Sequence, residues 1–178
     1  RSLDDAIITA ALGTAKTGEN GSTDTAFATA TQQIAVGGTG LTVAKLRQAK
    51  KILTANEVDV MNDPLYIAVT AQQIDDLLGT TEVTSADFNT VRALVQGEVD
   101  SFMGFKFVNI ERLGLDGSGD RRCFAWAKSG MHVGMWNDIN TKITERADKS
   151  YATQVYVKGT FGATRTDEKK VVEIICNL

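Results

Sequence analysis

Residues 42–79, TVAKLRQAKKILTANEVDVMNDPLYIAVTAQQIDDLLG, carry the clearest fold signals of the 178-residue chain. In residues 42–55 the apolar side chains recur at intervals of three and four, which predicts an amphipathic helix. Thr42 stands at its start, where a hydroxyl can accept a hydrogen bond from a free backbone N–H. The side chains expected to face the core are Val43, Leu46, Ala49, Ile52 and Leu53, and those expected to face solvent are Lys45, Arg47, Gln48, Lys50 and Lys51.

A strand and a second helix follow within the same stretch. Residues 66–69 form a short apolar run that predicts a strand. Thr70 and Gln73 then have the spacing of a capping box, in which each side chain satisfies a backbone N–H at the start of a helix. This helix is predicted over residues 71–78, and a third helix is predicted over residues 85–96 from its apolar periodicity.

The segment before residue 42 divides into a helix and a loop. Residues 3–12 have helical periodicity, and Gly13 is expected to end this helix. Residues 14–40 are rich in Thr, Ala, Gly and Ser and cannot supply a core. We therefore expect a long flexible surface loop there, with short strands at residues 26–29 and 33–36.

The part of the chain after residue 100 predicts mostly antiparallel strands. A buried strand is expected around Gly104, and residues 114–120 form a turn-rich tip. Two hairpins are expected beyond it, one pairing residues 122–127 with 131–137 and one pairing residues 152–164 with 170–176. The fold class is therefore α+β, with a central sheet flanked by the three helices after residue 41 and a separate long hairpin at the end.

Composition and charge argue against several classes of protein. The formal net charge is -3 and the sequence pI is about 5.2, with the basic residues scattered, so a nucleic-acid-binding protein is not favoured. Cys123 and Cys176 lie in apolar surroundings and are expected to be reduced core residues. The sequence has neither a signal-peptide pattern nor an apolar run long enough for a membrane helix.

Reactive side chains do not converge in this sequence. The single histidine, His132, and two dispersed cysteines cannot form a metal site by themselves. The glycines of residues 37–40 precede a helix but lack the Lys-Ser/Thr pair of a phosphate-binding loop. Asp116 and Asp120 lack the ligand spacing of a calcium loop. We therefore expect no catalytic site, no bound cofactor and no metal.

Six segments, taken in order, resemble the major capsid proteins of tailed bacteriophages and prophages with the Hong Kong 97 fold. They cover almost the whole chain. The segments are LDDAIITAALGTA (3–15), LTVAKLRQAKKIL (41–53), PLYIAVTAQQIDDLLG (64–79), ALVQGEVDSFMGFKFVNIERL (93–113), FAWAKSGMHVGMWNDINTKITER (124–146) and YATQVYVKGTFGATRTDEKKVVEIIC (151–176).

This resemblance implies a division of the chain into the domains of that fold. Residues 1–13 would be the end of the spine helix in the peripheral domain, and residues 14–40 a flexible loop. Residues 41–150 would be mainly the axial domain, and residues 151–178 the closing strands of the peripheral domain. Because the chain begins at Arg1 rather than Met, and the family's N-terminal arm and extended loop have no counterpart, we expect the C-terminal portion of a longer subunit.

The resemblance also implies a function. The chain would be a structural subunit of an icosahedral bacteriophage capsid, made in the host cytoplasm, that assembles into pentamers and hexamers and becomes part of the virion. Its partners would be other copies of itself and scaffolding, portal or decoration proteins, and the shell would enclose DNA without specific binding. The alternative is a carbohydrate- or peptide-binding module, which would need an aromatic-lined groove. Phe27 is the only aromatic residue of the loop over residues 14–40.

Charged side chains are the candidate subunit contacts. The basic helix face and a nearby acidic group would be complementary, and the turn-rich tip would contribute two further carboxylates; an ordinary solvated surface is the alternative. The residues are Lys45, Arg47, Lys50, Lys51, Asp75, Asp76, Glu82, Asp116 and Asp120.

Overall fold

The computed structural model describes residues 1–79 and 101–178. The helix predicted over residues 85–96 and the candidate contact Glu82 lie outside the described residues. In chain order the helices and strands are α1 (Ser2–Leu12), β1 (Ala15–Thr17), β2 (Thr23–Thr25), α2 (Thr29–Gln32), β3 (Gln33–Ile34), α3 (Val43–Ala55), β4 (Leu65–Val69), α4 (Ala71–Gly79), β5 (Ser101–Phe102), β6 (Phe105–Asn109), β7 (Arg121–Ala127), β8 (Met131–Arg146), β9 (Ala152–Arg165) and β10 (Val171–Cys176).

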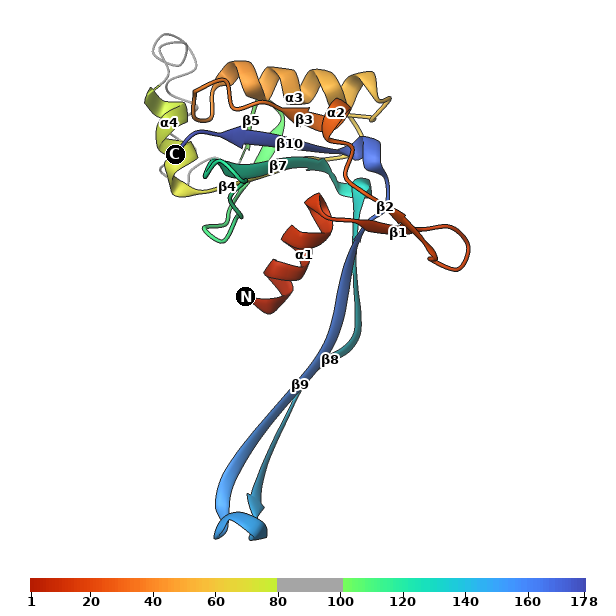
Figure 1. Cartoon of the computed structure of the whole chain (residues 1–178), viewed down its shortest axis with the longest axis vertical. Coiled ribbons are helices and arrows are strands. Elements are labelled where there is room, and N and C mark those ends of the chain that lie inside the picture. The colour runs from red at the N-terminus through yellow and green to blue at the C-terminus, as the bar shows by residue number, and fades with distance from the viewer. Residues whose placement is uncertain (80–100) are drawn as a thin grey trace.

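A six-stranded mixed sheet forms the body of the protein, in the order β3-β10-β7-β4-β6-β5. The β3–β10 and β4–β6 pairs are parallel, and the other neighbours are antiparallel. Helix α3 lies along one face of this sheet, and α1 lies on the opposite side (Figure 1). This arrangement of helices and mixed strands confirms the α+β class.

Helix α3 forms where its periodicity predicts it. The hydroxyl of Thr42 accepts a hydrogen bond from the Lys45 backbone N–H at 3.3 Å, so the expected N-cap is present. Leu46 and Leu53 are fully buried against the sheet. Burial of side chains of this size contributes about 1.5–3 kcal/mol each, so this face fixes α3 to the sheet.

Strand β4 and helix α4 also follow the sequence prediction, with one difference in the cap. The Gln73 side-chain oxygen accepts a hydrogen bond from the Thr70 backbone N–H at 3.3 Å, as a capping box requires. The Thr70 hydroxyl donates to the same oxygen instead of accepting from a backbone N–H. The free N–H of Ala71 is satisfied by the carboxylate of Glu111, at 2.6 Å.

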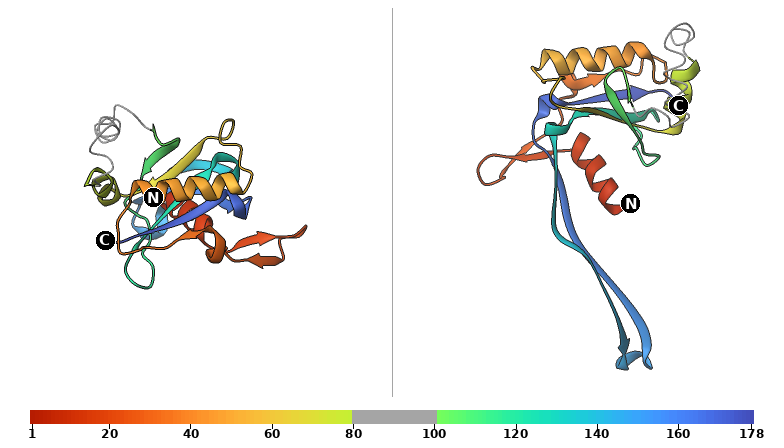
Figure 2. Two further views of the ribbon diagram at one scale, coloured as in Figure 1. Left: turned by 90° about the horizontal axis from the view of Figure 1, so that it is seen from above. Right: turned by 180° about the vertical axis from the view of Figure 1, so that it is seen from behind.

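A long arm projects from the body. It consists of β8 and β9, which pair antiparallel from Met131 opposite Arg165 to Arg146 opposite Ala152. Figure 1 and the right-hand view of Figure 2 show this arm leaving the sheet on the side of α1. At its tip, Ser150 and Tyr151 both have positive φ, a left-handed turn that closes the two strands.

Both hairpins predicted from the sequence are wrong in their pairing. Residues 122–127 do not pair with 131–137, because β7 lies between β10 and β4 in the sheet. Residues 152–164 do not pair with 170–176, because β9 pairs with β8 and β10 pairs with β7 and β3. A turn of 3-10 helix at Lys128–Gly130 directs the chain from the sheet into the arm instead of closing a hairpin.

The segment over residues 14–40 is more ordered than the expected flexible loop. Strands β1 and β2 form a small hairpin, and α2 leads into β3, which adds a parallel edge strand to the sheet. The strand expected at residues 33–36 is therefore present in part, whereas residues 26–29 form no strand. The Thr17 and Thr25 hydroxyls hydrogen-bond at 2.8 Å across this hairpin, so threonine-rich sequence supplies polar pairing rather than a core.

One charged cluster lies inside the sheet. Glu173 of β10 is fully buried, and both of its carboxylate oxygens are bonded: Arg122 Nε donates to one at 2.5 Å and Gln33 Nε2 to the other at 2.7 Å. Three neighbouring strands are thereby joined by one carboxylate. A buried carboxylate tolerates this position only while its partners remain.

We predict that Arg122→Ala lowers the free energy of unfolding by about 3–5 kcal/mol, because it leaves the Glu173 carboxylate buried without its cation. Urea denaturation of the purified chain measures the change. The paired variant Arg122→Met with Glu173→Met is the control, since removing both charges should recover most of the loss. A single variant as stable as the unmodified chain would contradict this account of the sheet.

Candidate assembly interface

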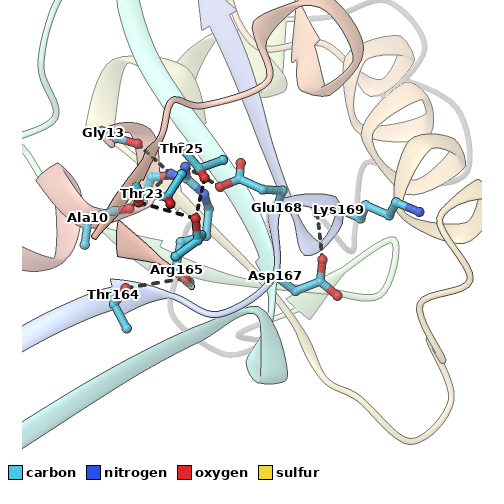
Figure 3. A network of polar contacts seen from close by, with 11 residues as sticks. Ala10, Gly13, Thr23, Thr25, Thr164, Arg165, Asp167, Glu168 and Lys169 are labelled. Carbon is cyan, nitrogen blue, oxygen red and sulfur yellow. Dashed lines mark hydrogen bonds and ion pairs between the residues drawn. The ribbon is translucent and has the colours of Figure 1, made fainter. Parts of the chain in front are cut away.

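Arg165 joins the arm to the body. It is the last residue of β9 and only 5% exposed. Its Nη1 donates to the carbonyl oxygens of Ala10, Ala11 and Gly13, at 3.2, 2.9 and 2.9 Å. Its Nη2 donates to the Glu168 carboxylate at 2.7 Å. Figure 3 shows this network, in which one guanidinium reaches the end of α1 and the turn before β10.

The position of Arg165 follows from helix chemistry. The last carbonyl groups of a helix have no partner within the helix and carry partial negative charge, so a cation is favoured there. The guanidinium also lies over the ring of Phe27, 5.2 Å from its centre. Helix α1, the loop after β2 and the base of the arm therefore meet at one buried cation.

The two faces of the arm differ in chemistry. Paired residues of an antiparallel ribbon share a face, and residues two apart along a strand lie on the same face. By this register one face is mainly apolar, although it also carries Thr141, Glu145 and Thr153. Ile139 joins this face because its Cγ1 lies 3.9 Å from where a Cβ on Gly159 would be. The apolar face carries Val133, Met135, Ile139, Ile143, Val155, Val157 and Phe161, and the polar face carries His132, Lys142, Thr144, Tyr156, Lys158 and Thr164.

Most of the apolar face is exposed. Ile139, Ile143 and Val155 are 74%, 70% and 62% exposed, and Trp136, in the irregular part of β8, is 92% exposed. A two-stranded ribbon alone is marginally stable in water, and an exposed apolar patch of this kind marks an interaction surface. The arm therefore has the character of a contact element rather than of a free loop.

Lys45 is a correction to the predicted contact set. The sequence predicts it on the solvent face of its helix, but it is 6% exposed. Its ammonium donates to the carbonyl oxygens of Thr39, Gly40 and Ile175, at 2.7, 2.9 and 2.9 Å. Burial lowers the pKa of Lys45. Since all three donors are used within the subunit, Lys45 fastens the loop before α3 to the end of β10.

The other basic candidates remain on the surface. Arg47 and Lys51 are exposed on α3, and Lys50 is half-buried, with its ammonium 3.1 Å from the Met103 carbonyl. On α4, Asp75 is exposed, whereas Asp76 is half-buried and accepts from Gln72 Nε2 at 3.1 Å. Within the described residues no salt bridge joins the basic to the acidic candidates.

The two tip carboxylates have different surroundings. Asp116 accepts hydrogen bonds from the backbone N–H groups of Ser118 and Asp120, at 2.8 and 2.9 Å, and these bonds lower its pKa. The loop is therefore held by Asp116 itself. Asp120 is half-buried beside it. Whether either group contacts another subunit stays a prediction.

The two cysteines and the histidine do not lie together in a reactive site. Cys123 and Cys176 are free and fully buried on neighbouring strands, as predicted. A hydrogen bond with Cys176, together with burial, raises the pKa of the Cys123 thiol, so the thiol is not an activated nucleophile. His132 is exposed on the arm. In residues 1–79 and 101–178 no group of acidic, histidine and cysteine side chains has a metal-binding arrangement, and no helix is long and apolar enough to cross a membrane.

Solved structures with this fold identify its class. The chain matches the structure of Mycobacterium phage Che8 with a TM-score of 0.63 and 17% identity, over 97% of this chain and 56% of that one. It matches the capsid asymmetric unit of cyanophage Pam1 with a TM-score of 0.67 and 14% identity, over 99% and 65%. The holo-SrpI encapsulin complex of Synechococcus elongatus PCC 7942 matches with a TM-score of 0.53 and 8% identity, over 82% and 53%. The fold is therefore that of phage capsid proteins, the Hong Kong 97 fold.

Phage capsid proteins and encapsulins share this fold, and a family model shows to which of them the chain belongs. The model described as phage capsid protein matches residues 1–178, so the chain belongs to the phage capsid protein family and is a component of the virion. No curated protein sequence matches the chain. The chain spans little more than half of the Che8 chain and about two thirds of the Pam1 chain.

The alternative of a carbohydrate- or peptide-binding module is not supported. It required Phe27 to line a groove, but Phe27 is 8% exposed and lies beneath the Arg165 guanidinium. The features that sequence reasoning missed are Arg165 and the apolar arm face. The alternation of Val155, Val157 and Phe161 is a visible signal for that face, but the sequence prediction pairs this strand with the wrong partner.

We predict that Arg165→Met lowers the free energy of unfolding by about 3–5 kcal/mol, because it removes a buried cation from three carbonyl oxygens and a carboxylate. Hydrogen exchange should also become faster throughout α1. Arg146→Met is the matched control: this arginine pairs with Asp148 on the surface, so its loss should cost less than about 1 kcal/mol. Equal losses for the two variants would show that Arg165 is not the anchor.

Proposed function

We propose that this protein is the structural subunit of an icosahedral bacteriophage capsid, which assembles into pentamers and hexamers that enclose the genome. The observation that carries the proposal is the exposed apolar face of the arm. Its aliphatic side chains gain stability only when another surface covers them. Repeated contacts between copies supply such a surface, and rings follow when heterologous contacts close.

The domain division is part of this proposal. Helix α1 and the arm over residues 131–165 would form the peripheral part, and the sheet with α3 and α4 would form the axial part. This differs from the boundary expected at residue 150, because β8 and β9 pair along their length and β10 returns to the sheet. The Arg165 cluster would then lie at the junction between the two parts.

The surface charges complete the proposed contact set. Asp75 is available at the surface of the axial part, and Asp116 and Asp120 lie on the loop before β7. Exposed pairs contribute at most about 1 kcal/mol each, so they would set the orientation between copies while the arm supplies most of the binding free energy. Scaffolding, portal and decoration proteins are further proposed partners, and a purely structural role predicts no catalytic activity.

We predict that Ile143→Glu prevents assembly of the complete gene product. Burial of an aliphatic side chain of this size contributes about 1.5–3 kcal/mol, so each contact should weaken roughly ten- to hundredfold. Ile143 is 70% exposed in the single subunit, so the subunit itself should fold normally. Sedimentation velocity and electron microscopy of particles from the expressing cells measure the outcome.

Thr144→Glu is the control for this experiment. Thr144 is the next residue of the same strand and lies on the polar face, so it adds the same charge at the same distance along the arm. This variant should still form shells. If both variants assemble as well as the unmodified protein, the arm is not the contact element and the proposed function loses its main support.

A further inference from the structure

Helix α3 presents a cationic face that no carboxylate of residues 1–79 and 101–178 neutralises through a salt bridge. Residues 43–55 contain Lys45, Arg47, Lys50 and Lys51 but no acidic residue. Lys45 is buried, which leaves three cations on the outside. The helix lies on the side of the sheet opposite to α1 and the arm, so this face is separate from the apolar contact surface (Figure 2).

The three cations have little charge compensation from the part of the chain that the structure describes. No carboxylate of the described residues forms a salt bridge with Arg47, Lys50 or Lys51. Arg47 and Lys51 are four residues apart on the same helix, a like-charge spacing that costs a few tenths of a kcal/mol. Lys50 is half-buried and donates to the Met103 carbonyl at 3.1 Å.

The face is concave. A shallow hollow lies between the helix and the turn after β5, lined by Arg47, Lys50, Lys51, Thr54, Ala55 and Met103. Small side chains at residues 54 and 55 leave room for a rounded, negatively charged object to approach the three cations together. A protruding acidic chain or a phosphate backbone would both fit this description by charge.

The carboxylates of the described residues favour a phosphate backbone, rather than a second copy of the chain, as the ligand of this face. Five of them pair with a cation within the subunit: Asp5 with Arg112, Asp24 with Lys16, Asp148 with Arg146, Glu168 with Arg165 and Glu173 with Arg122. Asp59, Asp63, Asp116 and Glu111 accept from backbone N–H groups. On α4, Asp75 is exposed but Asp76 is half-buried and bonded to Gln72, so the described part of that helix offers no acidic face of matching charge.

We propose that the outer face of α3 binds the phosphodiester backbone of nucleic acid without reading its sequence, and that this face points toward the enclosed genome. The inference rests on the proposed function, because only a shell that encloses nucleic acid would keep a polyanion permanently beside this face. Arginine and lysine are the usual donors to phosphate oxygens, and such contacts carry no sequence information. The net charge of -3 does not oppose this, because the cations are gathered on one helix.

Three phosphate contacts make the binding weak and strongly dependent on salt. For duplex DNA the logarithm of the binding constant falls with the logarithm of the salt concentration by about 0.9 per phosphate contact. With three contacts, affinity should fall about 40-fold between about 50 and about 200 mM salt. At the high concentration of nucleic acid inside a shell, weak contacts of this kind would still be occupied.

The test compares two charge-matched variants of the unassembled protein, with a fluorescent duplex DNA as the probe. One variant combines Arg47→Gln, Lys50→Gln and Lys51→Gln, and fluorescence anisotropy should show that it loses the salt-dependent binding. The control combines Lys106→Gln, Lys128→Gln and Lys158→Gln, which removes the same charge from exposed positions elsewhere and should keep the roughly 40-fold salt effect. Because Lys50 also bonds to Met103, Arg47→Gln with Lys51→Gln alone provides a version that leaves this contact in place.

Assembly is measured separately on the same variants, so that failure of this inference can be told from failure of the proposed function. Loss of DNA binding by the helix variants alone, with shells still formed, supports the inference. Equal binding by all variants, or no binding by the unmodified protein, overturns it while assembly remains intact. Helix variants that fail to self-associate would assign the face to contacts between copies and would also overturn it.

Discussion

The buried guanidinium of Arg165 is the interaction on which the arrangement of this subunit depends. A charge taken out of water is costly unless its partners are well placed, and here the partners come from three segments: the end of α1, the turn before β10 and the loop after β2, which carries Phe27. Arg165 is also where β9 ends, so the same contact sets where the arm leaves the body. If any of these segments were misplaced, the buried guanidinium would lose a partner. The contact therefore favours one arrangement of the junction.

The two parts that meet at this junction differ in how far their apolar side chains are buried. The body has a core of its own, in which Leu46 and Phe124 are fully covered. The arm is a two-stranded ribbon whose apolar face is mostly open to water. Such a division suits a building block, because a well-packed body can present an arm that reaches its lowest free energy only in an assembly. Nucleic acid contacts would use the outer face of α3, on the side of the body away from the arm.

The sequence predicted the elements better than their partners, for physical reasons. Helix α3 and strand β4 are recognisable because their periodicity and caps are local. Strand β10 is buried along its whole length, so its pattern does not indicate which strand lies beside it. The register of β8 shifts between Met135 and Asn140, which interrupts the alternation that would have identified the arm. Lys45 and Arg165 were not recognisable as internal, because their partners are backbone carbonyls, which leave no pattern in a sequence.

The central claim is that this subunit builds a shell through its arm, and a cryo-electron-microscopy reconstruction of the particles formed by the complete gene product tests it most directly. The account predicts rings of five and six subunits, with Ile139, Ile143 and Val155 buried against other parts of the assembly and α3 facing the interior. A gene product that remains a single subunit in solution, or particles in which the apolar face of the arm stays exposed to solvent, would contradict it.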